Sequence, residues 1–311
     1  MNIFAMLPYA IHWNVDPEIF SIGPIHVRYY GLLFMSGFIL GYWMFTKFFK
    51  REGLPLQLLD TLLYLLLGCT LVGSRLGHVL FYQPEYYLAN PIEIFKVWEG
   101  GLASHGGTIA IMIGMWWFVK KYGRKYDFDY LWILDRLAVA VCFAAMFIRL
   151  GNLMNSEIYG NPTDLPWGFI FETRGEIFPK HPTQLYEALC YLGTGIIMSY
   201  LYWFRLDKIK RGLLLGIFFI GIFGSRFLIE YVKEPQVAFE EGMALNMGQL
   251  LSIPFIIMGI CLIVRSFIIK TPAALEQKGN NKRPGCCIWA PAVVKRPLDA
   301  LYIAAHILFF D

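Results

Sequence analysis

The chain has 311 residues, of which 57% are hydrophobic and only 16% are charged, and its mean hydropathy is +0.50. This composition excludes an ordinary water-soluble domain and indicates a polytopic membrane protein. The formal net charge of +4 comes without a dense basic face or an aromatic nucleic-acid motif. We therefore expect the membrane bilayer as a partner, and no nucleic acid.

Seven stretches are long enough to cross about 30 Å of hydrocarbon, for which a helix needs about 20 residues. The predicted spans are residues 28–48, 58–81, 102–119, 130–150, 183–204, 212–232 and 248–269. We expect an all-α polytopic membrane protein, with a transmembrane domain over residues 1–270 and a tail over residues 271–311. The N-terminal segment has no basic leader and is interrupted by Pro8, so the first span is expected to insert uncleaved.

Basic residues between the spans predict the orientation, because cytoplasmic loops retain Lys and Arg. Seventeen of the 27 basic residues lie in loops 47–57, 120–129 and 205–211 or after residue 269, whereas the other loops and the first 27 residues hold four. With an odd number of spans, the N-terminus then faces outward and the C-terminus is cytoplasmic. Loop 152–182, rich in Gly, Pro and aromatic residues, is expected to form a small extracytoplasmic elaboration.

The sequence VRYYGLLF at residues 27–34 places two tyrosines, Tyr29 and Tyr30, at an outer membrane boundary. Tyrosines at this depth commonly form an aromatic belt, and position alone favours that role.

The sequence GGLASHGGTIA at residues 100–110 surrounds His105 with four glycines, which let backbones approach closely and leave the imidazole room to meet a substrate. A histidine whose pKa lies near its ordinary value of about 6.5 can take a proton from a thiol or hydroxyl. His105 is therefore a candidate general base. The alternative is a structural histidine that donates to a neighbouring carbonyl.

The richest polar cluster is RLGNLMNSEIYG, residues 149–160, at the end of an apolar helix. Arg149, Asn152, Asn155 and Glu157 place a guanidinium, two amides and a carboxylate within nine residues. Such groups are costly beside lipid unless they bind something. A phosphate headgroup is the natural ligand.

Two later motifs add charged residues to the spans. Glu187, in HPTQLYEAL at residues 181–189, can face inward with Gln184 or can neutralise one of the span arginines. Arg226 and Glu230 are four residues apart on one helix face. They either form a local ion pair, or Glu230 orients Arg226 toward a phosphate, for which a planar guanidinium is better suited than Lys.

Arg136 is expected to snorkel to the cytoplasmic end of its span.

The cysteines of the chain predict neither a metal site nor a disulfide. Adjacent Cys286 and Cys287 lack metal-ligand spacing, and the other cysteines lie in apolar segments, where Cys behaves as a small hydrophobe. The chain also shows no Ser-His-Asp triad and no P-loop.

Six motifs follow one another over residues 28–235: RYYG, SRLGHVLFY, GGLASHGG, RLGNLMNSEIYG, HPTQLYEAL and RFLIEYVKEP, with GQLLSIP after them at residues 248–254. In this order and spacing the chain resembles the prolipoprotein diacylglyceryl transferase family, bacterial enzymes of lipoprotein maturation. The resemblance covers nearly the whole membrane domain and excludes the tail beyond about residue 275.

The resemblance implies an enzyme of the bacterial cytoplasmic (inner) membrane that needs no cofactor. The family transfers the sn-1,2-diacylglyceryl group of phosphatidylglycerol to the thiol of a lipobox cysteine in a preprolipoprotein, forming a thioether and releasing glycerol phosphate. It implies catalytic roles for His105, Tyr30, Asn152 and Glu157, and phosphatidylglycerol binding by Arg149, Arg226, Glu230 and Gly160.

The sequence departs from the family pattern at a few positions. Lys233 stands where the family usually has an arginine, Gln236 where an aspartate follows proline, and Leu153 where an aromatic residue is common. The alternative function is a transporter or flippase of an anionic lipid, since arginines in spans also mark substrate pathways. Such proteins often carry inverted repeats, and the sequence shows none.

Overall fold

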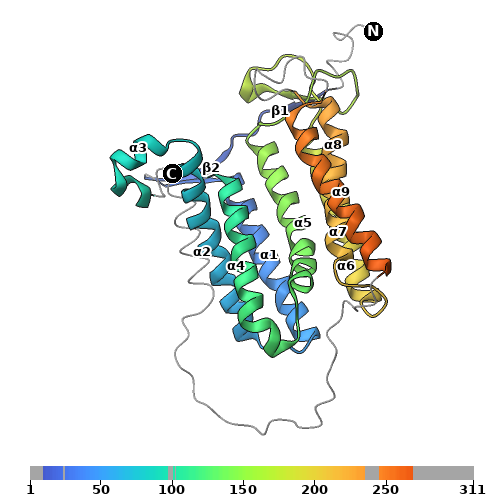
Figure 1. The fold of residues 1–311 in the computed structure, drawn as a ribbon. Coiled ribbons are helices and arrows are strands. Elements are labelled where there is room, and N and C mark those ends of the chain that lie inside the picture. Colours follow the sequence, from blue (N-terminus) through green and yellow to red (C-terminus); the bar gives the residue numbers. More distant parts are fainter. Residues whose placement is uncertain (1–9, 24, 97–100, 102, 235–244, 269–311) are drawn as a thin grey trace. The chain divides into compact units, whose positions relative to one another are not determined.

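The computed structural model describes residues 10–23, 25–96, 101, 103–234 and 245–268 (Figure 1). The tail predicted over residues 271–311 lies outside the described residues. The α-helices are α1 (Tyr29–Arg51), α2 (Leu56–Phe81), α3 (Pro84–Ala89), α4 (Ser104–Tyr126), α5 (Tyr130–Met154), α6 (Thr183–Arg205), α7 (Leu213–Phe219), α8 (Ser225–Ile229) and α9 (Met247–Ile268). The strands are β1 (Ile11–Trp13), β2 (Glu18–Ile22), β3 (Ile25–Arg28) and β4 (Phe169–Phe171). The described residues also form the short helical turns η3 (Pro91–Phe95), η5 (Glu172–Arg174), η6 (Ile220–Gly224) and η7 (Glu230–Val232).

Within the described residues, five helical segments are long and apolar enough to cross a membrane. They are Tyr29–Arg51, Leu56–Phe81, Tyr130–Met154, Leu213–Val232 and Met247–Ile268, and they support five of the seven predicted spans. The other two predicted spans coincide with α4 and α6, which have 23 residues each. Both of these helices are more polar, because α4 ends in KKYGRKY and α6 begins with TQLYE.

The chain forms two compact units. The first unit comprises Met1–Phe45 and Leu134–Ala273, and the second comprises Thr46–Ile133 and Ala274–Asp311. The boundaries fall inside α1 and α5.

In the second unit, α2 and α4 lie side by side (Figure 1) and approach closely through glycines. A Cβ on Gly106 would collide with the backbone of Gly73 and Gly77, and one on Gly107 would lie 2.5 Å from Ser74 Oγ. Two of the glycines around His105 therefore have a packing role, because small residues let helices approach closely in a membrane.

Arg75 in α2 is a structural residue of the second unit. It is 4% exposed, and its guanidinium donates to the carbonyl oxygens of Ile94 and Gly101 at 3.0 and 3.3 Å. The guanidinium also lies 5.0 Å from the ring centre of Tyr87. These contacts fasten the short helices α3 and η3 to the end of α2, in a segment for which the sequence predicted only a loop.

In the first unit, α9 packs along α7 and the π-helical turn η6. Gly216 and Gly259 bring the two backbones together, since a Cβ on either residue would lie 3.0 Å from the other's carbonyl oxygen. The rings of Phe223 and Phe255 stack at 4.2 Å. The chain from α7 to η7 thus forms one continuous helical segment of membrane length that contains a π turn.

Two buried charges in α5 anchor this helix to its neighbours. The Asp135 carboxylate accepts the backbone N–H groups of Gly212 and Leu215 at 2.7 and 2.9 Å, and so caps the start of α7. Arg136 is fully buried and lies 5.5 Å from the ring centre of Tyr202. The prediction that Arg136 snorkels to the cytoplasmic end of its span is wrong, because the side chain is fully buried and its guanidinium lies near the ring of Tyr202.

Residues 155–182, between α5 and α6, form a layer over the end of the first unit where α5 ends and α6 begins. Its strand β4 pairs in parallel with β1, with Ile11 opposite Phe169. The Trp13 indole N–H donates to the Leu153 carbonyl at 3.1 Å, which ties β1 to the last turn of α5. Phe169, Phe171 and Leu153 form a small buried core beneath this pairing.

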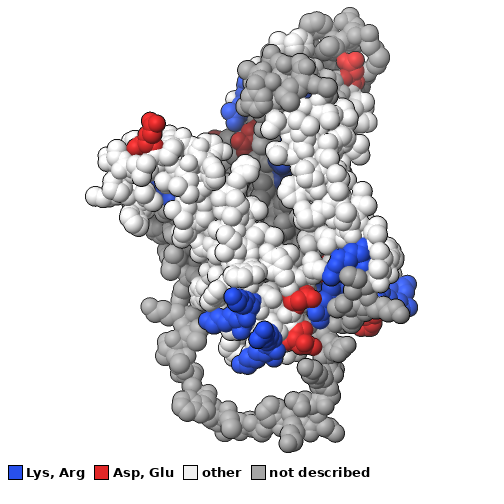
Figure 2. All heavy atoms as spheres, viewed as in Figure 1, with Lys and Arg blue, Asp and Glu red and all other residues white. Residues whose placement is uncertain are grey.

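Charged side chains gather near the ends of the helices, whereas the middle parts of the helices are almost uncharged on the face in Figure 2. In the second unit, the last turns of α1 and α4 carry Lys50, Arg51, Arg124 and Lys125. In the first unit, α6 and α9 end in turns that carry Arg205 and Arg265. This distribution is typical of spanning helices that present Lys and Arg to the cytoplasm.

Candidate functional site

A cluster of buried charges lies where α5 ends, α6 begins and η7 ends, in the first unit. We call Arg149, Glu187, Glu230 and Lys233 the charge cluster. Arg149 Nε lies 2.6 Å from Glu187 Oε2. Lys233 Nζ lies 3.6 Å from Glu187 Oε1 and 3.5 Å from Glu230 Oε2. Two carboxylates and two cations thereby compensate one another away from water.

Exposure distinguishes the members of the charge cluster. The side chains of Glu187 and Lys233 are 1% and 2% exposed, whereas that of Arg149 is 14% exposed. Burial lowers the pKa of Lys233 below its ordinary value, although Glu187 and Glu230 oppose this shift. Arg149 is therefore the cation of this cluster that a ligand can reach, and the ammonium of Lys233 is nearly enclosed.

A chain of amides connects Arg149 to Glu157. Arg149 Nη1 donates to Asn152 Oδ1 at 3.2 Å, and Asn152 Nδ2 donates to Glu157 Oε1 at 2.8 Å. Asn155 Nδ2 also donates to Glu157 Oε1, at 3.2 Å. The structure thus brings together all four polar residues of the RLGNLMNSE segment that the sequence singled out.

The loop that carries Glu157 is held in an unusual conformation. Ser156 and Ile158, on either side of Glu157, have positive φ angles of 51° and 63°, which non-glycine residues rarely adopt and which functional sites often contain. Arg174 fixes the loop by donating to the carbonyl oxygens of Ser156 and Asn155, at 3.1 Å each. The layer above the helices therefore sets the position of the Glu157 carboxylate.

Tyr30, in the first turn of α1, packs beside this network. A Cβ on Gly151 would lie 2.7 Å from Tyr30 Cδ2, so the tyrosine ring fills the space left by that glycine. The Tyr30 hydroxyl makes no hydrogen bond to any residue within the described ranges. A ligand that bonds this hydroxyl would therefore displace none of the described residues.

Arg226 and Glu230 are arranged differently from the predicted pair. In the part of the chain that the structure describes, the Arg226 guanidinium has no hydrogen bond or ion pair, and the side chain is partly exposed. Glu230 contacts Lys233 instead, and its carboxylate lies against Gly248 in the first turn of α9. Neither the local ion pair of Arg226 with Glu230 nor the direct orientation of Arg226 by Glu230 is found.

Gly160 lies at a crossing of backbones. Its N–H donates to the His181 carbonyl at 2.8 Å, and the next N–H, of Asn161, donates to the Val232 carbonyl at 2.9 Å. A Cβ on Gly160 would collide with Val232 O and would lie 2.8 Å from Thr183 Cγ2. Glycine is needed here for packing, and these contacts join the site loop to the segment that carries Lys233.

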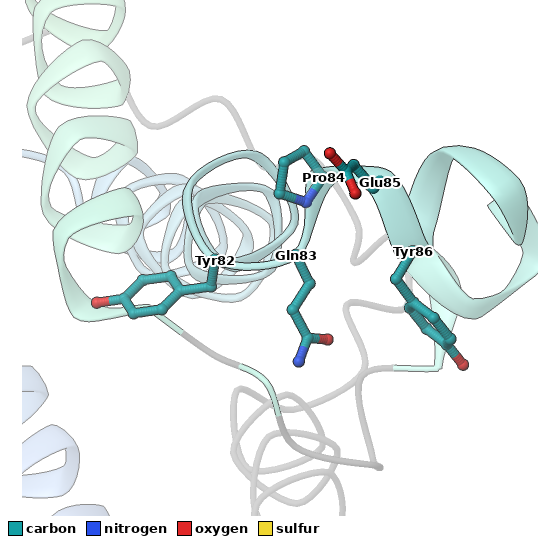
Figure 3. Close-up of a pocket in the computed structure, with 5 residues that line it drawn as sticks. All are labelled: Tyr82, Gln83, Pro84, Glu85 and Tyr86. Carbon is teal, nitrogen blue, oxygen red and sulfur yellow. The ribbon is translucent and has the colours of Figure 1, made fainter.

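His105 belongs to the second unit, in the first turn of α4, and its side chain is exposed. The other seven predicted site residues all lie in the first unit. A shallow recess of about 590 Å³ in the second unit is lined by Tyr82, Gln83, Pro84, Glu85 and Tyr86 (Figure 3). None of the predicted site residues lines this recess.

Two members of the charge cluster, Glu187 and Lys233, are not among the predicted site residues. One of the two roles predicted for Glu187 is to neutralise a span arginine, and the structure confirms that it pairs with Arg149. Lys233 stands out in the sequence only as a departure from the family pattern. The signal that could have identified Glu187 was a carboxylate inside a predicted span, which is costly unless a cation compensates it. Lys233 follows directly after a predicted span and lies close to Glu230 and Glu234 in the sequence, so its charge alone does not single it out.

Known proteins are similar to this chain over most of its length. Residues 17–265 match the sequence model of the prolipoprotein diacylglyceryl transferase family. A phosphatidylglycerol–prolipoprotein diacylglyceryl transferase of Porphyromonas gingivalis is 50% identical over 282 residues, covering 86% of this chain and 97% of the relative. A protein of the same name from Tolumonas auensis is 48% identical over 258 residues, covering 82% of this chain and 97% of the relative.

Proposed function

Because the chain belongs to the prolipoprotein diacylglyceryl transferase family, we propose that its charge cluster binds the phosphate of phosphatidylglycerol during transfer of the diacylglyceryl group to a prolipoprotein. The enzyme is a multi-pass membrane transferase of lipoprotein biosynthesis. The observation that carries the proposal is the partly exposed guanidinium of Arg149, which is held on two sides by Glu187 and Asn152.

Arg149 has donors left for a phosphate. A guanidinium carries five N–H donors. Glu187 and Asn152 each engage one nitrogen, and the buried side chain of Tyr191 lies near the same guanidinium. At least two donors remain, which is the number that a bidentate phosphate contact requires. Arg226, which has no hydrogen bond or ion pair in the described ranges, supplies the second cation.

The neighbouring residues hold this arrangement together. Asn152 and Glu157 fix one edge of Arg149 through their hydrogen bonds. Glu230 compensates Lys233 beneath the site. Tyr30, whose hydroxyl has no hydrogen bond to a described residue, binds the lipid headgroup, and Gly160 lets the backbones cross close to the site.

The reaction needs a base and an anion site. The thiol of the lipobox cysteine, whose ordinary pKa is about 8.5, loses its proton to His105. The thiolate then attacks the glyceryl carbon that bears the phosphate. A C–S bond forms, the C–O bond breaks, and glycerol phosphate leaves with the electron pair. Arg149 and Arg226 stabilise the charge that grows on the departing phosphate.

The topology that we propose suits this chemistry. α4 and α6 join the five apolar segments as spans, which makes seven in residues 1–270. The N-terminus faces outward, the tail after residue 270 is cytoplasmic, and the charge cluster lies at the outer face of the bacterial inner membrane. The retention of Lys and Arg in the last turns of α1, α4, α6 and α9 supports this orientation.

Purified protein in detergent, incubated with phosphatidylglycerol and a lipobox peptide, tests the proposal. The expected result is a diacylglyceryl thioether on the peptide together with release of an equal amount of glycerol phosphate, and neither product with a Cys→Ser peptide. If the protein instead scrambles anionic lipid in vesicles and modifies no peptide, the transferase assignment is wrong and a flippase is favoured.

A further inference from the structure

Glu187 is the most deeply buried member of the charge cluster. Its side chain is 1% exposed, and a buried carboxylate is costly unless cations and donors compensate it. Its two oxygens face two different cations, since Oε2 lies 2.6 Å from Arg149 Nε and Oε1 lies 3.6 Å from Lys233 Nζ. Both contacts are ion pairs, and the one to Arg149 is the shorter.

The helix that carries Glu187 is fastened to the site loop. Gln184 Nε2 donates to the Glu157 carbonyl at 2.6 Å, and Thr183 Oγ1 donates to the Ile158 carbonyl at 2.8 Å. The start of α6 therefore moves with the loop that places the Glu157 carboxylate. Arg149 is contacted from two directions by groups that these hydrogen bonds join, with Glu187 at its Nε and the amide of Asn152 at its Nη1.

We propose that Glu187 is a positioning residue of the transferase, which fixes the Nε edge of Arg149 and so aims the remaining donors of that guanidinium at the phosphate. The inference rests on the proposed function and adds a specific role for a carboxylate that touches no substrate. When one edge of a planar guanidinium is fixed by a carboxylate, the N–H donors on its other edge point in one direction. A misplacement of about 1 Å in such a group costs about 10²-fold in rate.

A different role for Glu187 would be to neutralise Lys233 alone. The two roles separate in a double-mutant cycle, because residues that act through one another give non-additive effects and independent residues give additive ones. If Glu187 acts through Arg149, Glu187→Gln has the same effect whether residue 233 is Lys or Met. If Glu187 serves Lys233, removing both charges together restores the enzyme.

The experiment measures kcat and the KM for phosphatidylglycerol in wild type, E187Q, K233M and the E187Q/K233M double variant, in detergent with a lipobox peptide. We expect E187Q to lower kcat at least about tenfold, in the wild-type and K233M backgrounds alike, because the charge on the phosphate grows as the C–O bond breaks. The KM changes less than kcat. The matched control is E234Q, which removes an exposed carboxylate that pairs with Lys180 at 3.1 Å and is expected to keep the wild-type kcat.

Two results would overturn the inference: an E187Q variant with wild-type kcat, or a double variant that recovers the kcat of K233M. Should E187Q fail to fold, the inference is tested by comparing the kcat of the double variant, which loses one charge of each sign, with the kcat of K233M. Absence of transfer by the wild-type protein would count against the proposed function itself, before any variant is compared.

Discussion

Gly160 shows how single residues determine the shape of the site. The Val232 carbonyl and the side chains of His181 and Thr183 fill the space that a Cβ would need. The sequence marked this glycine only through the family resemblance, since its role depends on segments more than 20 and 70 residues away. A requirement for close approach of distant backbones is not visible in local sequence.

Gly160→Ala should lower the thermal midpoint of the purified protein in detergent, because the new methyl group overpacks the crossing at a cost of about 1–3 kcal/mol. Gly193→Ala is the matched control, since Gly193 lies in α6 with open space around its Cβ position. There we expect a small gain of about 0.5–1 kcal/mol from helix propensity. Equal midpoints for the two variants would contradict the packing role of Gly160.

His181 should make the stability of the layer above the helices depend on pH. The Trp167 indole N–H donates to the Tyr186 hydroxyl at 2.9 Å, and this hydroxyl donates to His181 Nδ1 at 3.2 Å when the imidazole is neutral. Burial lowers the pKa of His181. The folded state therefore binds this proton less readily than the unfolded state, whose histidine pKa is about 6.5.

The stability from His181 is complete above about pH 6.5 and decreases as pH falls below that value toward the pKa of the folded state. We expect the thermal midpoint to fall between about pH 7 and pH 5, and His181→Gln to flatten that part of the curve. The measurement is a pH series of thermal unfolding in detergent. An unchanged pH slope in the variant would refute the assignment.

The π-helical turn η6 is the most informative element of the first unit. The sequence predicted one continuous span over residues 212–232, and the structure inserts a π turn at Ile220–Gly224 just before Arg226. Gly221 in this turn lies against Thr194 of α6. A π turn adds a residue and rotates the side chains that follow it, so it helps to determine where Arg226 points.

Gly221→Val should lower transfer about tenfold or more while the protein still inserts, because the new side chain meets Thr194 and displaces the turn before Arg226. Gly224→Ala is the control within the same turn, since open space surrounds its Cβ position, and transfer should continue there. The readout is initial rate per folded protein. Equal rates in both variants would show that the packing of the turn does not govern Arg226.

Sequence patterns predicted the helices better than the contacts between them. The helices α1, α2 and α5 begin and end within a few residues of the predicted spans 28–48, 58–81 and 130–150. Hydropathy suffices for this, because a spanning helix must satisfy its own backbone hydrogen bonds. The pairing of β1 with β4 joins residues about 158 apart, and no local pattern encodes such a contact.

At the scale of the whole molecule, the first unit contains seven of the eight residues that the sequence nominated, and the second contains His105. The sequence can nominate these residues because guanidinium, amide and carboxylate groups are rare beside lipid. It cannot predict which of them contact one another, because Glu187 contacts Arg149 and Lys233, which are 38 and 46 residues away in the sequence. Only the fold brings these charges together.

The proposed orientation predicts which sites an impermeant thiol reagent labels in intact cells. In a variant whose own cysteines are replaced, Ile177→Cys should be labelled from outside, and Asp207→Cys only after the membrane is opened. Both side chains are exposed in the structure, so access depends on the side of the membrane. The reverse labelling pattern would invert the topology.

Replacement of Arg149 tests the central claim, that this guanidinium binds the phosphate of the lipid, most directly. The measurement is the rate of peptide lipidation by purified Arg149→Ala, compared with Arg205→Ala in the last turn of α6. We predict that Arg149→Ala lowers the rate by about 10²-fold or more, as expected for the loss of a donor to developing charge. Arg205→Ala should retain the wild-type rate. A folded Arg149→Ala protein that lipidates the peptide at the wild-type rate would contradict the account.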